Sequence, residues 1–100
     1  MGKKIIWTNY ATAELNEAFL DLLEQSESIE ITTKVMGEVV ESVEILKTHP
    51  EIYKLDKLRK SNKGTIRTFE KHSYRISYQV EKEIVYIIRI RYAGKEPLEY

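Results

Sequence analysis

Two alternating segments, residues 74–80 and 84–92, constrain the fold of this chain more than any other part of its sequence. In both segments every even-numbered position holds an apolar or aromatic residue, which is the period-two pattern of a β-strand with one buried face. The polar tripeptide Glu81-Lys82-Glu83 separates the two segments. The sequence therefore predicts a β-hairpin near the C-terminal end.

The register of this hairpin is expected to bring arginines together. Opposed residues of an antiparallel pair share a face, so the tightest register that matches even positions pairs Val80 with Ile84. Arg75 then lies opposite Arg89, with Arg91 one diagonal step away. Because like charges across a ladder are destabilising, we expect an anion to bind between them.

The composition indicates a single globular domain over residues 1–100. The absence of cysteine excludes disulfides and thiol catalysis, and two histidines alone do not indicate a zinc site, so we expect neither metal nor cofactor. No apolar run approaches the ~20 residues of a membrane helix. The N-terminus also lacks the apolar stretch of a signal peptide, so we expect a cytoplasmic protein without a membrane partner.

The formal net charge of zero conceals a marked asymmetry between the two halves of the chain. Residues 1–51 hold four lysines against ten acids, a net charge of −6, whereas residues 52–100 hold twelve cations against six acids, a net charge of +6. Acidic residues on the solvent-facing sides of helices explain the negative charge of the first half, but they do not explain the positive charge of the second half. The asymmetry indicates one cationic surface suited to nucleic acid or to an acidic protein.

Two amphipathic helices are predicted before the hairpin. Thr8 or Asn9 can cap the first, whose apolar stripe covers residues 11–23, and the second spans about residues 30–48. Short strands are expected at residues 4–7 and 65–71. The order βααβββ predicts an α+β fold of two layers, an antiparallel sheet with a helical hairpin packed on one face. The expected stripe of the second helix consists of Ile31, Val35, Met36, Val39, Val40, Val43 and Leu46.

If the helices cover one face of the sheet, the odd-numbered face of the hairpin stays open. Arginines there can bind phosphate groups bidentately, and nearby tyrosines can stack on bases. The alternative is an ordinary solvated surface, because no familiar catalytic motif accompanies these residues. The open face is expected to carry Arg75, Ser77, Gln79, Val85, Ile87, Arg89 and Arg91.

The same region offers a set of residues that could cleave RNA without a metal. An arginine would stabilise the pentacoordinate phosphorane, and a lysine or tyrosine of lowered pKa would take the proton of the 2′-hydroxyl. The sequence permits this mechanism without demanding it. The set consists of Arg75, Arg89, Arg91, Lys71, Lys95, Tyr92 and Tyr100.

The chain resembles the RelE/ParE superfamily, the toxins of type II toxin–antitoxin modules. The resemblance runs the whole length and rests on Ile6-Trp7-Thr8, Leu58-Arg59, Arg67-Thr68-Phe69 and, above all, residues 74–80 and 87–92. It implies a βααβββ fold and a cognate antitoxin. It also implies one of two activities: RelE-like members cut messenger RNA on the ribosome without a metal, whereas ParE-like members inhibit DNA gyrase and cut nothing.

The resemblance assigns roles to individual residues. Arg75 matches the arginine that holds the scissile phosphate in RelE-like nucleases, and Arg91 matches a second cationic position. Lys95 falls near a further cation, and Tyr100 corresponds to a C-terminal tyrosine. These four are the candidate catalytic residues. The candidate substrate-binding residues are Arg67, Lys71, Arg89 and Tyr92.

The chain departs from the RelE-like pattern at positions that concern the acid–base step of the nuclease reaction. A lysine pair of the nucleases falls on Ile66 and Thr68, and Tyr92 stands where many relatives have histidine. The first hypothesis is nevertheless a ribosome-dependent, metal-independent mRNA endoribonuclease that a cognate antitoxin neutralises. The alternatives are a ParE-like inhibitor of DNA gyrase and an inactive module that only binds its antitoxin. In each case an acidic amphipathic antitoxin segment is expected to cover the odd face beside Val85 and Ile87.

Overall fold

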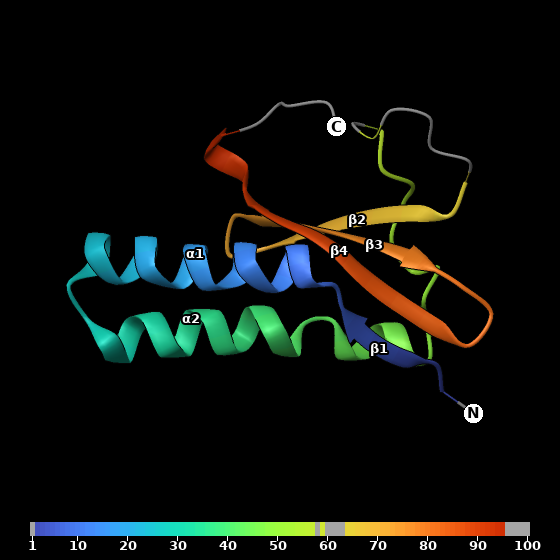
Figure 1. Cartoon of the computed structure of the whole chain (residues 1–100), viewed down its shortest axis with the longest axis horizontal. Helices are drawn as coiled ribbons and strands as arrows, with labels where there is room; N and C mark the ends of the chain where they lie inside the picture. Colours follow the sequence, from blue (N-terminus) through green and yellow to red (C-terminus); the bar gives the residue numbers. More distant parts are fainter. Residues whose placement is uncertain (1, 58, 60–63, 96–100) are drawn as a thin grey trace.

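The computed structural model describes residues 2–57, 59 and 64–95, the last without its side chain. Two helices and four strands follow one another in the predicted order βααβββ (Figure 1). Among the described residues no helix is long and apolar enough to span a membrane. The elements are β1 (Lys4–Trp7), α1 (Asn9–Ser26), α2 (Ile29–Glu41), a 3₁₀ helix (Glu44–Lys47), β2 (Ile66–Lys71), β3 (Tyr74–Val80), β4 (Ile84–Tyr92) and a second 3₁₀ turn (Ala93–Lys95).

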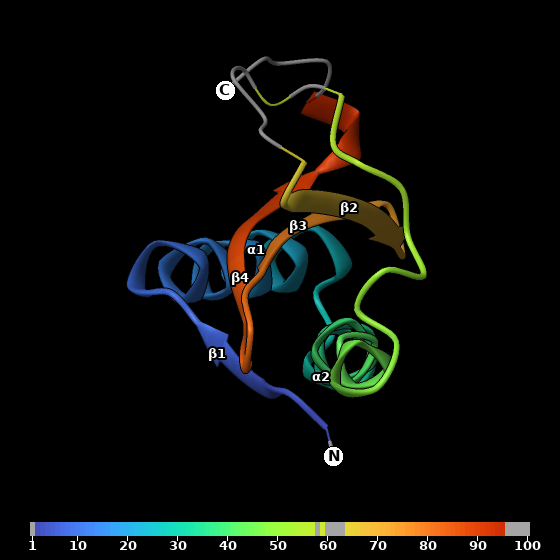
Figure 2. The same cartoon turned by 90° about the vertical axis from the view of Figure 1, so that its right-hand side faces the viewer.

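The four strands form one sheet in the order β1-β4-β3-β2, with the helical hairpin packed against it (Figures 1 and 2). The predicted antiparallel pairing is correct for β2, β3 and β4, whereas β1 pairs with β4 in parallel. Parallel neighbours need a long connection, and the rest of the chain lies between these two strands. A four-residue strand gives no sign of its direction in the sequence. The predicted α+β architecture is thus confirmed, with a mixed rather than a purely antiparallel sheet.

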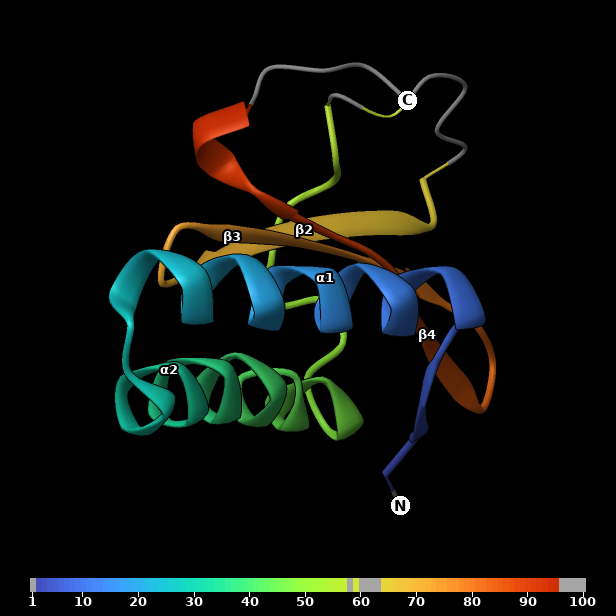
Figure 3. The same ribbon diagram turned by 60° about the vertical axis from the view of Figure 1, so that its left-hand side comes forward.

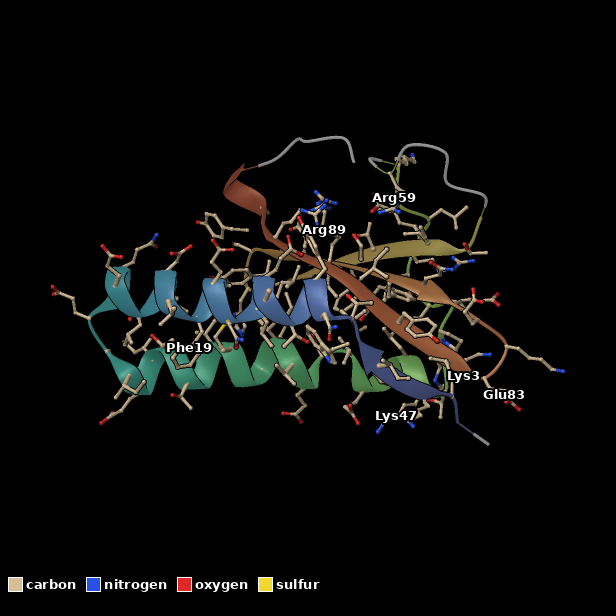
Figure 4. The ribbon with its side chains drawn as sticks, viewed as in Figure 1. Lys3, Phe19, Lys47, Arg59, Glu83 and Arg89 are labelled. Atoms are coloured by element: carbon tan, nitrogen blue, oxygen red, sulfur yellow. The ribbon has the colours of Figure 1, made fainter. Side chains whose placement is uncertain are left out.

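The N-terminal end of the first strand is fixed by hydrogen bonds to two other parts of the chain. The backbone N–H of Lys3 donates to the carbonyl of Lys47 at 2.7 Å, and that of Lys4 to the carbonyl of Glu83 at 2.9 Å. The ammonium group of Lys3 also donates to the carbonyls of Glu81 and Lys82 in the hairpin turn, at 2.8 and 2.5 Å. Figure 4 shows Lys3, Lys47 and Glu83 gathered at this end of the sheet.

Both helices begin at a hydroxyl cap. The side-chain oxygen of Thr8 accepts from the N–H of Ala11 at 3.1 Å, which confirms one of the two predicted caps, and Ser28 accepts from Ile31 at 3.1 Å. α2 was expected to reach residue 48 but ends at Glu41. There the N–H of Ser42 bonds to the carbonyls of both Glu38 and Val39, which tightens the last turn before the 3₁₀ helix.

The buried face of α2 differs from the predicted stripe. Met36 and Val39 are buried as expected, but Ile31 and Val40 are 53% and 39% exposed. Thr32 is completely buried in their place. Its hydroxyl donates to the backbone carbonyl of Ser28 at 2.8 Å, so burial leaves no polar group unsatisfied.

The predicted register of the hairpin is wrong by one residue at the turn, and by two residues beyond a bulge in β4. Val80 pairs with Val85 rather than Ile84, and the register shifts between Ser77 and Tyr78. The extra residue reverses the parity of β4, since a shift of one residue exchanges the two faces of a strand. The pairing now sets Arg75 opposite Arg91, and Ser77 opposite Arg89.

The observed register also corrects the expected open face. Val85 and Ile87 are both completely buried, so they cannot form the apolar part of an antitoxin surface on that face. Ile90 is buried beyond the bulge. The core between sheet and helices consists of Ala11, Met36, Val39, Val43, Leu46, Phe69, Tyr74, Ile76, Tyr78, Val85, Ile87 and Ile90.

The connection from the helices to β2 wraps around the β2 edge of the sheet (Figure 2). The N–H of Asp56 bonds to the carbonyl of Ile66 at 3.0 Å, and the N–H of Thr68 bonds to the carbonyl of Lys54 at 3.1 Å. Asp56 is 2% exposed and accepts a hydrogen bond from the hydroxyl of Ser77 at 3.0 Å. The predicted open face is therefore closed at Ser77.

Candidate binding surfaces on the sheet and along α1

Arg75 and Arg91 form a pair of like charges on adjacent strands. They lie directly opposite each other on β3 and β4, and Glu70 of β2 lies opposite Arg75 on its other side. A carboxylate oxygen of Glu70 is 3.3 Å from the guanidinium of Arg75, whose side chain is 22% exposed. The guanidinium nitrogens of Arg91 are almost completely shielded from solvent. The protein itself thus supplies an anion for Arg75.

Arg89 is held between α1 and β4 by Glu14. The Nε of Arg89 lies 3.1 and 3.0 Å from the two oxygens of Glu14, and its terminal nitrogen lies 3.0 Å from one of them. The same carboxylate accepts the backbone N–H of Ile90 at 2.9 Å, on the edge of β4 that β1 does not reach. The ring of Tyr10 covers the guanidinium of Arg89, whose Cζ atom lies 5.0 Å from the ring centroid. Arg89 is labelled in Figure 4. Arg89 therefore joins the helix to the sheet.

A groove of about 630 Å³ runs between α1 and the C-terminal end of the hairpin. Figure 3 shows how α1 lies along the sheet on this side. The helix contributes one face to the groove, and the sheet contributes Tyr74, Ile90 and Tyr92 among others. The rings of Tyr74 and Tyr92 meet edge to face, with centroids 5.6 Å apart. The lining residues of α1 are Glu14, Glu17, Ala18, Asp21, Leu22 and Gln25.

Comparison with known proteins decides the family. The sequence model described as the ParE toxin of the type II toxin–antitoxin system parDE matches residues 5–97, nearly the whole chain. The chain belongs to the ParE toxin family. None of the curated protein sequences matches it significantly.

The fold of this ParE-family toxin also occurs among solved structures. A chain of the chromosomal ParDE toxin–antitoxin system from P. aeruginosa superposes with a TM-score of 0.71. The two sequences are 22% identical, and the match covers 90% of the present chain and 95% of the other. At this identity the likeness concerns the fold alone. It confirms the arrangement of helical hairpin and sheet that the sequence predicted.

The predicted site residues of the toxin do not form one cluster. Arg67 and Lys71 lie opposite Tyr78 and Tyr74, on the helix side of the sheet, whereas Arg75 and Arg91 lie on the other side. Arg67 donates to the backbone carbonyl of Tyr53 at 2.7 Å. Lys71 is exposed at the end of β2. These two cations therefore stand apart from the arginine pair.

The remaining predicted residues lie at or beyond the end of β4. Tyr92 is 47% exposed and lines the groove. Lys95 lies in the final turn, and its side chain is outside the described part of the structure, as is the whole of Tyr100. The predicted catalytic role of these two residues stays a prediction.

The perturbed tyrosines are poor candidates for a general base. Burial raises the pKa of Tyr78 to about 12, and its hydroxyl donates to the carbonyl of Pro50 at 2.7 Å. Burial also raises the pKa of Tyr74. A tyrosine that abstracts a proton near neutral pH needs a lowered pKa, whereas burial raises the pKa of both tyrosines.

A histidine and a carboxylate form one further pair near the groove. The ring of His72, in the β2–β3 turn, lies 2.6 Å from a carboxylate oxygen of Glu38 on α2, and this hydrogen bond lowers the pKa of Glu38. Both His72 and Ser73 have positive φ angles, 51° and 67°, as a tight two-residue hairpin turn requires. Within the described residues, no cluster of three or more histidine, aspartate or glutamate side chains could hold a metal.

Proposed function

We propose that this toxin acts by inhibiting DNA gyrase in the cytoplasm, without cutting RNA, and that a cognate antitoxin neutralises it. The match to the ParE toxin family over residues 5–97 carries the proposal. Gyrase inhibition is the activity that the resemblance assigns to ParE-like members, and the family description names a two-component system, parDE. An antitoxin encoded with the toxin is the natural counterpart.

The surroundings of Arg89, Tyr74 and Tyr78 support this choice over the ribonuclease hypothesis. The nuclease mechanism needs a free phosphate-binding arginine beside a group of lowered pKa. Arg89 is engaged by Glu14, and burial moves the pKa values of Tyr74 and Tyr78 upward. Lys95 and Tyr100, which the nuclease mechanism also uses, lie outside the described side chains, so that hypothesis still awaits its test.

The charge asymmetry supports neutralisation by an acidic antitoxin segment. Residues 52–100 carry a net charge of +6, and Arg75 and Arg91 lie side by side on β3 and β4. An acidic segment laid over this face would gain from the surrounding cationic field. Because Val85 and Ile87 are buried, the attraction there is mainly electrostatic and should weaken as salt is added.

Induction of the toxin in growing cells tests the proposed activity. We expect arrested division, gyrase-linked DNA breaks and intact messenger RNA, all reversed by co-expression of the antitoxin. Cleaved transcripts with intact DNA would contradict the proposal and restore the ribonuclease hypothesis. Unaffected growth, with the toxin detected in soluble form, would instead favour the inactive binding module.

A further inference from the structure

The groove along α1 has the dimensions of a peptide-binding site. Its helical wall runs from Glu14 to Gln25, twelve residues of α1, and the eleven steps between the two ends correspond to about 16 Å. A segment of about 11 residues in a helix, or about 5 in an extended strand, would fill that length. The groove is therefore long enough for a segment of a partner protein.

The lining of the groove combines an apolar floor with a negative rim. Leu22, Val35 and Ile90 supply apolar surface. On the rim, Glu17 and Asp21 are exposed, and among the described residues they make no hydrogen bond or ion pair. They are four residues apart on α1, so both carboxylates project on the same side of the helix.

The other charges of the groove offset this rim only in part: with His72 held by Glu38 and counted as neutral, three carboxylates and two arginines leave the lining a net charge of −1. Glu14 is neutralised by Arg89 at 3.0 Å, and the guanidinium nitrogens of Arg91 are shielded from solvent. The exposed ring of Tyr92, on the sheet side, offers a face on which a cation can rest. The complementary ligand is therefore an apolar segment that carries lysine or arginine.

We propose that the groove docks a basic, apolar segment of DNA gyrase, and so forms the target-binding surface of the toxin. This inference rests on the proposed function. Enzymes that handle DNA present lysine- and arginine-rich surfaces to its phosphates, and Glu17 and Asp21 match such a surface in charge. The antitoxin segment proposed above has the opposite sign and is directed to the arginine pair. The toxin would thus have two adjoining surfaces, an acidic groove for its target and a cationic sheet face for its antitoxin, with Arg91 at the boundary between them.

The test uses the full-length toxin with the paired substitutions Glu17→Gln and Asp21→Asn. The matched control is Glu24→Gln with Glu41→Gln, which removes one exposed charge from α1 and one from α2, both outside the groove. Supercoiling by purified gyrase is measured against toxin concentration. We expect the groove variant to need about tenfold more toxin for half-inhibition, and the control variant to match the wild type. Thermal unfolding and antitoxin affinity should be unchanged in both.

Each other result has a distinct meaning. Equal inhibition by the wild type and the groove variant would overturn the groove as the gyrase surface and leave the proposed function standing. Loss of antitoxin binding with full inhibition would overturn the assignment of the occupant, because the groove would then hold the antitoxin. If the wild type itself does not inhibit gyrase, the proposed function fails and this inference fails with it.

Discussion

Removal of the Glu14 side chain should destabilise the toxin strongly, because one carboxylate serves two partners. Glu14→Ala takes away the contacts to the guanidinium of Arg89, at 3.0 and 3.1 Å, and the acceptor of the Ile90 N–H, at 2.9 Å. The side chains of Glu14 and Arg89 are 17% and 22% exposed, so water can replace only part of what is lost.

The size of the effect follows from this partial burial. An exposed ion pair contributes up to about 1 kcal/mol, whereas removal of one partner of a fully buried pair costs about 3–5 kcal/mol. An intermediate cost of about 2 kcal/mol is therefore expected for Glu14→Ala. For a domain of this size that corresponds to a decrease in melting temperature of roughly 10 °C.

A double-mutant cycle with Arg89→Ala isolates the pair from the other effects. Chemical denaturation of the two single variants and the double variant should give a coupling energy of about 1 kcal/mol or more. The control is Glu17→Ala, one turn further along α1 and exposed, which should change stability by less than about 0.5 kcal/mol. A coupling energy near zero, or equal losses for Glu14→Ala and Glu17→Ala, would refute the role of Arg89 as a structural link.

Two further predictions concern the cap of α1 and a buried tyrosine. Thr8→Ala removes the acceptor of the Ala11 N–H and the donor to the carbonyl of Ile87, so denaturation should show a loss of about 1 kcal/mol, while Thr8→Ser should recover most of it. The pKa of Tyr78 is raised to about 12 from 10.0, so the unfolded chain loses this proton first, and stability should fall as pH rises from 10 toward 12. Tyr78→Phe should lessen that fall; an identical pH dependence in the variant would contradict the assignment.

The sequence predicted the elements of the fold well, because its periodic patterns report which residues are buried. It could not predict the bulge in β4. Residues 84–88 are all apolar or aromatic, so the sequence is compatible with burial of either face of the strand there. The residue at which the bulge exchanges the two faces therefore cannot be recognised in the sequence pattern. The predicted opposition of Arg75 and Arg89 failed because the turn and the bulge each shift the register by one residue.

The candidate surfaces were harder to predict because they combine distant parts of the chain. Glu14 and Arg89 lie 75 positions apart, and nothing in the local pattern of either segment indicates that they meet. The groove likewise needs one face of α1 beside the end of the hairpin. Thr32 shows a related limit, since a polar residue whose hydroxyl bonds within its own helix can be buried without appearing in a hydrophobic stripe.

The central claim is that this ParE-family toxin inhibits gyrase and does not cleave RNA. The most direct measurement is supercoiling by purified gyrase with increasing toxin, performed beside a translating ribosome reaction with a labelled message. The account predicts dose-dependent loss of supercoiling, restored by the antitoxin, and an intact message at the same toxin concentrations. Full supercoiling together with a message cut on the ribosome would contradict it.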